Sequence, residues 1–228
     1  MRHLIRLLRV PGFRYRDFRA PAAMVRSPSE GGGAFSIALV ALLPGAGRTA
    51  LCTNLVHAVR RRGRTASAVD LAGAAPSIAD RLAESEVVVV DTPLPPPSHA
   101  LTEPDALLVV IRPDDASLRA VPAMEERLAC TRMSRWTKAP ARYLVNAFDA
   151  RRSADRDAVS RLRTLLGPRL LRTLVQEDPA VSDAMAEGRL LADIAPASQA
   201  VADLDAVARE VLPRLRRKRA RRVAAETR

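Results

Sequence analysis

The chain has 228 residues and a mass of 24.7 kDa, enough for one substantial hydrophobic core, and only 3% of it is aromatic. Its formal net charge is +12, but the surplus lies at the two ends: residues 1–26 contain seven arginines and one aspartate, and residues 214–228 contain eight lysines or arginines and one glutamate. No cysteine or histidine spacing suits a metal site, and no apolar run reaches the roughly 18 residues of a membrane span, which excludes zinc-binding and membrane-spanning classes.

The first 33 residues form a basic extension. Its start, "MRHLIRLLRV", places leucines on one helical side and arginines largely on another, which is typical of a short amphipathic segment. "SPSEGGG", residues 27–33, has the composition of a flexible linker. We therefore expect a partly disordered basic extension over 1–33, a folded domain over 34–215 and a basic tail over 216–228.

Strands and helices alternate through the folded domain. Apolar runs such as "FSIALVALL" are typical of strands buried on both faces, and "RTALCTNLVHAVRRRG" has its apolar residues at helical spacing. The pattern predicts strands over 35–43, 65–72, 86–93, 105–113, 141–149 and near 170–175. It predicts helices over 48–63, 77–85, 115–133 (bent or started by Pro122), 153–166, 181–187 and 198–215. This alternation predicts an α/β fold, a three-layer sandwich with a mainly parallel central sheet.

The turn between the first strand and the first helix is rich in glycine. When the phosphate-loop signature G-x-x-x-x-G-K-[ST] is aligned with this turn, its second glycine matches Gly47 and its hydroxyl residue matches Thr49. The lysine position holds Arg48, and the first glycine position holds Leu42. Backbone N–H groups of such a turn, with the end of the helix dipole, form an anion site. The sequence therefore predicts a partial phosphate cradle over Gly45, Ala46, Gly47, Arg48, Thr49 and Ala50.

Two aspartates end neighbouring strands of the predicted sheet. Asp91 ends "VVVVD", and Asp70 ends "AVD". Ligands of open α/β sheets bind at the carboxyl edge of the strands, where an aspartate can reach a Mg²⁺ held by the loop hydroxyl. Thr49, Asp70 and Asp91 are therefore the predicted Mg²⁺-associated residues, although Asp91 could instead only cap the turn that follows it.

Four stretches together resemble the MinD/ParA group of P-loop ATPases, which carry a deviant Walker A loop. They are "GAGRTALCTNLVHAVRRRGRTASAVDLA", "VVVVDTP", "DALLVVIRPDDASL" and "YLVNAFDARR". The later stretch "VQEDPAVSDAMAEGRLLADIAPASQAVADL" is similar to the cellulose-synthase accessory group known as BcsQ or YhjQ. The resemblance covers about residues 35–215. It implies a P-loop NTPase-like domain of MinD/ParA type, ATP and Mg²⁺ as ligands, and a face-to-face homodimer.

Several residues that the resemblance makes important are replaced. The signature lysine of the group matches Leu43, the glycine after it matches Pro44, and the phosphate-contacting lysine matches Arg48. The second hydroxyl matches Ala50. Since losing one charged contact in phosphoryl transfer lowers the rate on the order of 10³-fold, we expect hydrolysis to be lost and ATP·Mg²⁺ binding to be weak or lost. Asn146 matches the position that reads the adenine base; the alternative is a strand-end amide that bonds to the backbone.

The two basic ends predict an anionic partner. An anionic membrane surface is favoured over nucleic acid because clustered Lys and Arg gain about 1 kcal/mol each near such a surface and no nucleic-acid recognition motif is present.

The leading hypothesis is a cytoplasmic accessory protein of bacterial cellulose biosynthesis, peripheral to the inner membrane, with cellulose synthase subunits as partners. The alternatives are an active MinD/ParA-type ATPase in cell-pole or DNA positioning, and a membrane- or DNA-associated adaptor with no link to cellulose.

Overall fold

The computed structural model describes residues 34–41, 43–71, 78–94, 104–129 and 140–212, together with the short strands 25–26 and 101–102. Both basic ends lie outside the described residues, apart from Val25–Arg26. The predicted domain boundaries and the amphipathic start therefore remain predictions.

The centre of the fold is a five-stranded, fully parallel sheet in the order β3-β4-β2-β6-β7. This confirms the predicted α/β class and the parallel sheet. The strands are β2 (Phe35–Ala41), β3 (Ala66–Asp70), β4 (Val87–Asp91), β6 (Ala106–Ile111) and β7 (Arg142–Val145). Two further strands, β1 (Val25–Arg26) and β5 (Leu101–Thr102), form a short parallel pair that the sequence did not predict. Buried valines, leucines and isoleucines fill the central strands, as their continuous apolar runs indicate.

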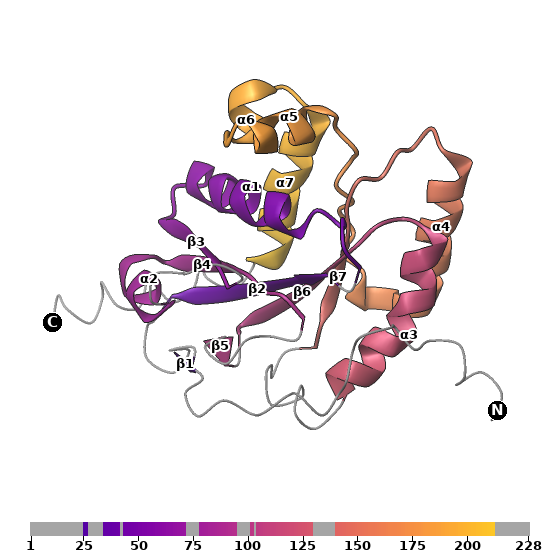
Figure 1. Ribbon diagram of the computed structural model, residues 1–228, viewed down its shortest axis with the longest axis horizontal. Helices are drawn as coiled ribbons and strands as arrows, with labels where there is room; N and C mark the ends of the chain where they lie inside the picture. Colours follow the sequence, from indigo (N-terminus) through magenta and orange to yellow (C-terminus); the bar gives the residue numbers. More distant parts are fainter. Residues whose placement is uncertain are drawn as a thin grey trace, which may run out of the picture.

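Helices cover both faces of this sheet, which gives the three layers seen in Figure 1. One face packs against α1 (Arg48–Arg61) and α7 (Gln199–Val211), with the short helices α5 (Ala180–Ala186) and α6 (Leu191–Ile194) beyond them. The other face packs against α3 (Asp115–Ala129), α4 (Ser153–Leu166) and α2 (Ile78–Glu84). Among the described residues, no helix is long and apolar enough to cross a membrane.

Most predicted helices are confirmed within a few residues, and their ends have local causes. Ser198 caps α7 by accepting a hydrogen bond from the N–H of Val201 at 3.3 Å. Asp114 accepts one from the N–H of Ser117 at 2.7 Å, so α3 begins at Asp115. Pro122 lies inside that helix and does not start it.

The strand predicted near 170–175 is wrong as a continuous element. The segment meets β7 at one isolated bridge, between Leu170 and Tyr143, where Leu171 N–H bonds to Tyr143 O at 2.8 Å; at its far end Val175 N–H bonds to Val145 O at 3.0 Å. Between those contacts, the N–H groups of Arg172 and Thr173 bond to the carboxylate of Glu210 at 3.0 and 3.1 Å. A side chain from α7 therefore takes the donors that a sheet ladder would have used.

The buried side chain of Tyr143 belongs to a partly exposed polar cluster that ties β7 to α3 and to the short 3₁₀ helix η2 (Gly167–Arg169). Its hydroxyl donates to Glu125, which also pairs with Arg169. Burial, and then the hydrogen bond to Glu125, raise the pKa of Tyr143 well above its ordinary value. These contacts join α3, β7 and η2.

Candidate functional site

The glycine-rich turn joins β2 to α1 at the carboxyl edge of the sheet, where the sequence places it. Gly45 and Gly47 both adopt left-handed backbone conformations, with φ of 77° and 83°. Gly47 is also the N-cap residue of α1, and a Cβ there would lie 2.3 Å from Nδ2 of Asn146. The turn thus needs glycine at position 47 for its backbone and for space. The first glycine position of the signature, residue 42, lies outside the described residues.

The side chain of Asn146 fixes the backbone of this turn by a hydrogen bond. It follows β7, and its side-chain Nδ2 donates to the carbonyl of Ala46 at 2.9 Å, while its own N–H donates to Ile111 O at 2.9 Å. Of the two predicted roles, bonding to backbone is the one realised in this structure. Contact with an adenine base is untested and stays a prediction.

Arg48 turns toward the end of the sheet. Its guanidinium donates to Thr92 O at 2.9 Å and its Nε lies in an ion pair with Oδ1 of Asp91. The Arg48 side chain is 20% exposed and that of Asp91 only 2%. The cation at the lysine position is therefore engaged by a buried carboxylate of the same chain.

The hydroxyl of Thr49 uses the other oxygen of the same carboxylate. It donates to Oδ2 of Asp91 at 2.6 Å. Both oxygens of Asp91 thus have partners from the first turn of α1. The sequence predicted that Thr49 and Asp91 lie close together, but not that Arg48 pairs with Asp91. Asp70 is the register partner of Asp91 on the neighbouring edge strand β3, and its side chain is exposed.

The residues present do not fit a bound Mg²⁺–nucleotide in this arrangement. Mg²⁺ takes hard oxygen ligands, and Asp91 and Thr49 would be the natural ones, but a guanidinium already neutralises Asp91. The phosphates would meet Pro44, which has no N–H, and no unpaired cation at position 48. Within the described ranges, no group of three or more His, Cys, Asp or Glu is placed to hold a metal ion.

Cys52 lies on the next turn of α1, beneath this pair. Its thiol is 2% exposed and its Sγ faces Val89 O at 3.6 Å. Burial, followed by the negative charges of Asp91 and Asp70, raises the pKa of Cys52 to about 12. Cys52 is therefore a buried free thiol, and Cys130 lies outside the described residues.

A cavity of about 460 Å³ opens on the Asn146 side of the turn, where a base would be expected from the resemblance. Its wall includes Gly47, Asn146 and Ala147, and its rim carries Glu177 and Asp178. Ala147 has a left-handed φ of 56°, unusual for a residue with a side chain. Glu177 pairs with Arg112, which also lines the cavity, and with Arg152, so the cavity carries charges of both signs.

Asn54 is a site-adjacent residue that sequence reasoning missed. It is 6% exposed; its Oδ1 accepts from the N–H of Leu191 at 2.9 Å and its Nδ2 donates to Ala50 O at 2.8 Å. The pair of bonds fixes the start of α6 to α1 beside the cavity. A polar residue on the apolar side of the helix "TALCTNLVHAV" was the available signal.

The fold matches those of solved P-loop ATPases. The MinD cell division protein of Aquifex aeolicus superposes with a TM-score of 0.63 at 16% identity, covering 79% of this chain and 98% of MinD. The McdA(D38A)–ATP complex of Cyanothece gives 0.62 at 11% identity, covering 80% and 98%. Cobyrinic acid a,c-diamide synthase of Mycobacterium smegmatis, with bound ADP and magnesium, gives 0.58 at 12%, covering 78% and 94%.

At these identities the likeness establishes the fold, which is that of MinD/ParA-type P-loop ATPase structures. No protein-family model and no curated protein sequence matches the chain. What the loop does in this chain is therefore a question for its own residues.

Proposed function

We propose that this protein is an accessory protein of bacterial cellulose biosynthesis and secretion. Its P-loop ATPase-like domain acts as an assembly or localisation scaffold and does not hydrolyse ATP. The observation that carries the loss of hydrolysis is the ion pair between Arg48 and Asp91, which engages both the loop cation and the metal-facing carboxylate. Leu43 and Pro44 support it, because neither offers a donor to a phosphate.

The link to cellulose rests on the sequence resemblance of the region that folds as α5, α6 and α7. This region lies against α1, and α5 borders the cavity beside the loop through Val181, Ser182 and Met185. On this proposal, subunits of the cellulose synthase complex are the partners. The position is cytoplasmic and peripheral to the inner membrane, with the basic ends of the chain attracted to anionic lipid.

The competing function is an active MinD/ParA-type ATPase that positions a cargo. In its favour are the fold shared with MinD and McdA and the retention of Gly47, Thr49 and Asp91 at their expected places. The two functions differ in nucleotide turnover, which makes them separable with purified protein.

The deciding experiment combines titration calorimetry of ATP·Mg²⁺ with a phosphate-release assay on the full chain. We expect the wild type to release phosphate no faster than the Asp91→Ala variant, and to give weak or absent heats of ATP·Mg²⁺ binding. Arg48→Lys is the informative companion, because it returns the ammonium and releases Asp91 from the guanidinium. Steady hydrolysis by the wild type that disappears in Asp91→Ala would establish the ATPase instead.

The cellulose link needs its own test. Pairwise interaction assays against the catalytic and membrane subunits of a bacterial cellulose synthase, with a Congo-red measurement of cellulose in a deletion strain, address it directly. Unchanged cellulose and no interaction would reject the link to cellulose and leave the adaptor and positioning-ATPase hypotheses. Flotation with anionic vesicles and a duplex-DNA shift assay, both across salt, separate the two anionic surfaces.

A further inference from the structure

All five strands of the central sheet are parallel, so their first residues lie along one edge, which we call the amino edge. The phosphate-loop turn follows β2 and therefore lies at the opposite, carboxyl edge, and α1 runs back from it toward the amino edge (Figure 1). β2 has seven residues that rise about 3.3 Å each, so about 20 Å separates the two edges. At that distance the two edges can meet different partners.

Both basic ends of the chain join the folded domain at the amino edge. The N-terminal extension enters just before Phe35, whose N–H donates to Glu86 O at 2.8 Å, next to the start of β4. The other end follows α7, in whose last turn Glu210 accepts a hydrogen bond at 2.9 Å from Arg142, the first residue of β7. The parallel topology thus brings to one edge two segments in which basic residues far outnumber acidic ones.

A short pair of strands holds the N-terminal extension near the same edge. β1 (Val25–Arg26) pairs in parallel with β5 (Leu101–Thr102), and only residues 103–105 separate β5 from β6. A chain of that length spans at most about 15 Å, so β5 lies within that distance of the start of β6. The extension is therefore held close to the amino edge by β1 as well as by its junction with β2.

The folded domain adds positive charge of its own at this edge. The turn between α1 and β3 reads "RRRGRT", residues 60–65. Arg61 pairs with Asp205 of α7 at 3.4 Å, whereas Arg62 and Arg64 make no ion pair among the described residues. A second carboxylate, that of Glu86, accepts a backbone N–H of the turn at 3.2 Å. Four arginines thus stand against these two carboxylates, and the turn keeps a net positive charge.

These arginines are accessible and lie level with the ends of the chain. The side chains at positions 60, 61 and 62 are exposed, and that of Arg64 is partly exposed. Ala66, just after the turn, is in register with Val87 of β4, which is in register with Phe35 of β2. Neighbouring strands lie about 4.8 Å apart, so the turn is about 10 Å from the point where the extension enters. We call the turn 60–65 and the two chain ends together the basic face.

A membrane surface matches the basic face better than nucleic acid does. Its parts come from three regions of the chain and lie along one edge, which suits a flat anionic surface, and clustered Lys and Arg are attracted to anionic lipid. The first residues, "MRHLIRLLRV", add leucines that a bilayer can receive, and stable attachment generally takes two such signals. A nucleic-acid duplex offers phosphates to the arginines but no apolar phase to the leucines.

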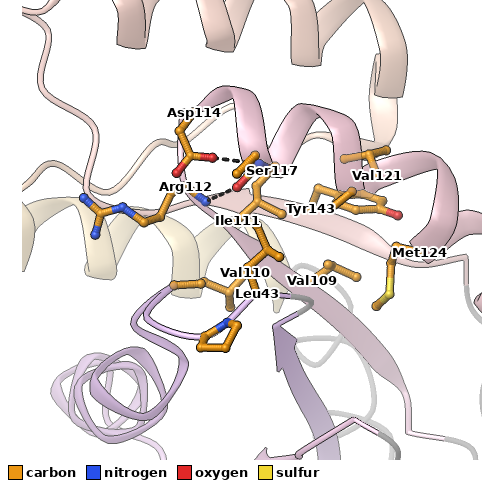
Figure 2. A pocket seen from close by; sticks show the side chains of 14 residues that line it. Leu43, Val109, Val110, Ile111, Arg112, Asp114, Ser117, Val121, Met124 and Tyr143 are labelled. Carbon is orange, nitrogen blue, oxygen red and sulfur yellow. Dashed lines mark hydrogen bonds between the residues drawn. The ribbon is translucent and has the colours of Figure 1, made fainter. Parts of the chain in front are cut away.

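The carboxyl edge differs, because it is hollowed around the phosphate-loop turn. A groove of about 850 Å³ lies between the turn and α3, and an apolar pocket of about 180 Å³ adjoins it. Figure 2 shows Leu43 of the turn, Val121 and Met124 of α3 and Tyr143 of β7 around this pocket. A chain bound to a surface through its amino edge leaves these hollows open to solution.

We propose that the folded domain docks on anionic lipid through the basic face, with the turn 60–65 against the headgroups and the phosphate-loop turn directed away from the bilayer. This mode of docking depends on the membrane location proposed above but not on the link to cellulose. It gives the folded domain a membrane contact, in addition to that of the two chain ends. Charges at the carboxyl edge, about two Debye lengths further from the lipid in physiological salt, would gain little from it.

The first test compares two double variants of the full chain in flotation with phosphatidylcholine vesicles, with and without phosphatidylglycerol. Arg62→Glu, Arg64→Glu alters the turn. Arg119→Glu, Arg156→Glu is the matched control, because it makes the same charge change at exposed arginines in the first two turns of α3 and α4, toward the carboxyl edge. We expect the turn variant to bind phosphatidylglycerol vesicles at least about tenfold more weakly, and the control less than about threefold. Urea unfolding of both variants checks that they fold.

The second test measures orientation with an environment-sensitive fluorescent label. In a Cys130→Ser background, where the remaining Cys52 is buried, Arg62→Cys places the label at the amino edge. Ala116→Cys places it at an exposed residue that lines the pocket of Figure 2. On anionic vesicles, lipid with a spin-labelled headgroup should quench the label at position 62. The label at position 116 should remain unquenched and accessible to iodide in solution.

The other outcomes are distinct. Vesicle binding that the turn variant leaves unchanged, or quenching at position 116 in place of 62, would overturn this inference and leave the proposed membrane location standing. Equal losses in both double variants would show general attraction to a chain of net charge +12 and would also overturn it. A duplex-DNA shift lost only in the turn variant, without vesicle binding, would assign the face to nucleic acid.

Failure of the proposed function would read differently. No vesicle binding by the wild type would reject the membrane location and this inference together. Phosphate release from ATP, or unchanged cellulose in a deletion strain, would reject the proposed function, and with the expected quenching this inference would stand.

Discussion

Arg48 and Asp91 form an ion pair at the junction of the loop and the sheet, and Thr49 donates to the second oxygen of the same carboxylate. In a nucleotide-binding version of this edge, a separate cation would face the phosphates and a metal would face the aspartate. In this protein the guanidinium of Arg48, from the same chain, pairs with Asp91 instead. The charges of the site are therefore balanced without a ligand.

Removing the arginine alone should destabilise the protein. Arg48→Ala leaves Asp91, 2% exposed, without its counter-charge, so we expect the free energy of unfolding to fall by about 3 kcal/mol in urea titrations. Arg48→Lys should lose much less. In the double variant Arg48→Ala, Asp91→Asn the loss should be smaller than the sum of the two single losses, since the pair acts as a unit. Additive losses would mean that the two side chains do not interact.

Replacing Gly47 by alanine should destabilise the protein much more than replacing Gly45 by alanine. Both have left-handed backbones, so alanine costs about 1–2 kcal/mol at either position. At Gly47 the new Cβ would also meet Nδ2 of Asn146 at 2.3 Å, whereas at Gly45 nothing lies within 4 Å. Gly47→Ala should therefore lower the thermal midpoint more than Gly45→Ala, and Asn146→Ala should narrow that gap. An equal effect at the two glycines would contradict the contact.

Glu210 should make stability depend on pH in the acid range. Burial alone raises the pKa of Glu210, but the N–H groups of Arg172 and Thr173 and the charge of Arg142 outweigh it, so the pKa falls below its ordinary 4.5. Because the folded-state pKa is the lower one, the carboxylate stabilises the fold above pH 4.5, and that contribution disappears as the pH falls through the folded-state value.

The measurement is the free energy of unfolding of the wild type and Glu210→Gln at pH 7 and pH 3. We expect the variant to be less stable by about 1 kcal/mol at pH 7 and the difference to become smaller at pH 3. A difference that persists unchanged at pH 3 would point to packing of the side chain instead of its charge.

Cys52 should be chemically silent in the folded protein. With its pKa raised to about 12, only about one thiol in 10⁴ is ionised at pH 8, and the sulfur is 2% exposed. In a Cys130→Ser background, Ellman's reagent should leave Cys52 unmodified over an hour without denaturant and modify it fully in urea. Rapid reaction of the folded chain would show that α1 opens away from the sheet.

Local pattern was sufficient for most of the fold. The apolar runs of β2, β4 and β6 locate their strands, and Ser198 and Asp114 mark helix starts by side-chain chemistry that acts within three residues. The segment 170–175 has the same apolar pattern, yet it is not a continuous strand. It forms no continuous ladder with β7 because the carboxylate of Glu210, a residue distant in the sequence, accepts hydrogen bonds from two of its backbone N–H groups.

The sequence predicted which residues of the candidate site lie near one another, but not which hydrogen bonds and ion pairs they form. Spacing placed Thr49 and Asp91 together, and the resemblance pointed to Asn146. The direction in which Arg48 turns depends on a carboxylate brought beside it by sheet register, and the amide of Asn146 meets Ala46 across 100 positions. The groove beside α3 depends on side chains from four separate segments, which no local pattern joins.

The interrupted segment 170–175 also determines how this sheet can meet another sheet. Its bridge to Tyr143 covers part of the outer margin of β7, so the other edge of the five-stranded sheet, β3, is the more open one among the described residues. There the Nε of Arg60 already donates to the carbonyl of Ala66 at 2.9 Å, at the point where β3 begins. Strand exchange or fibril growth would have to displace this guanidinium first, which favours discrete complexes formed through helices over open-ended polymers.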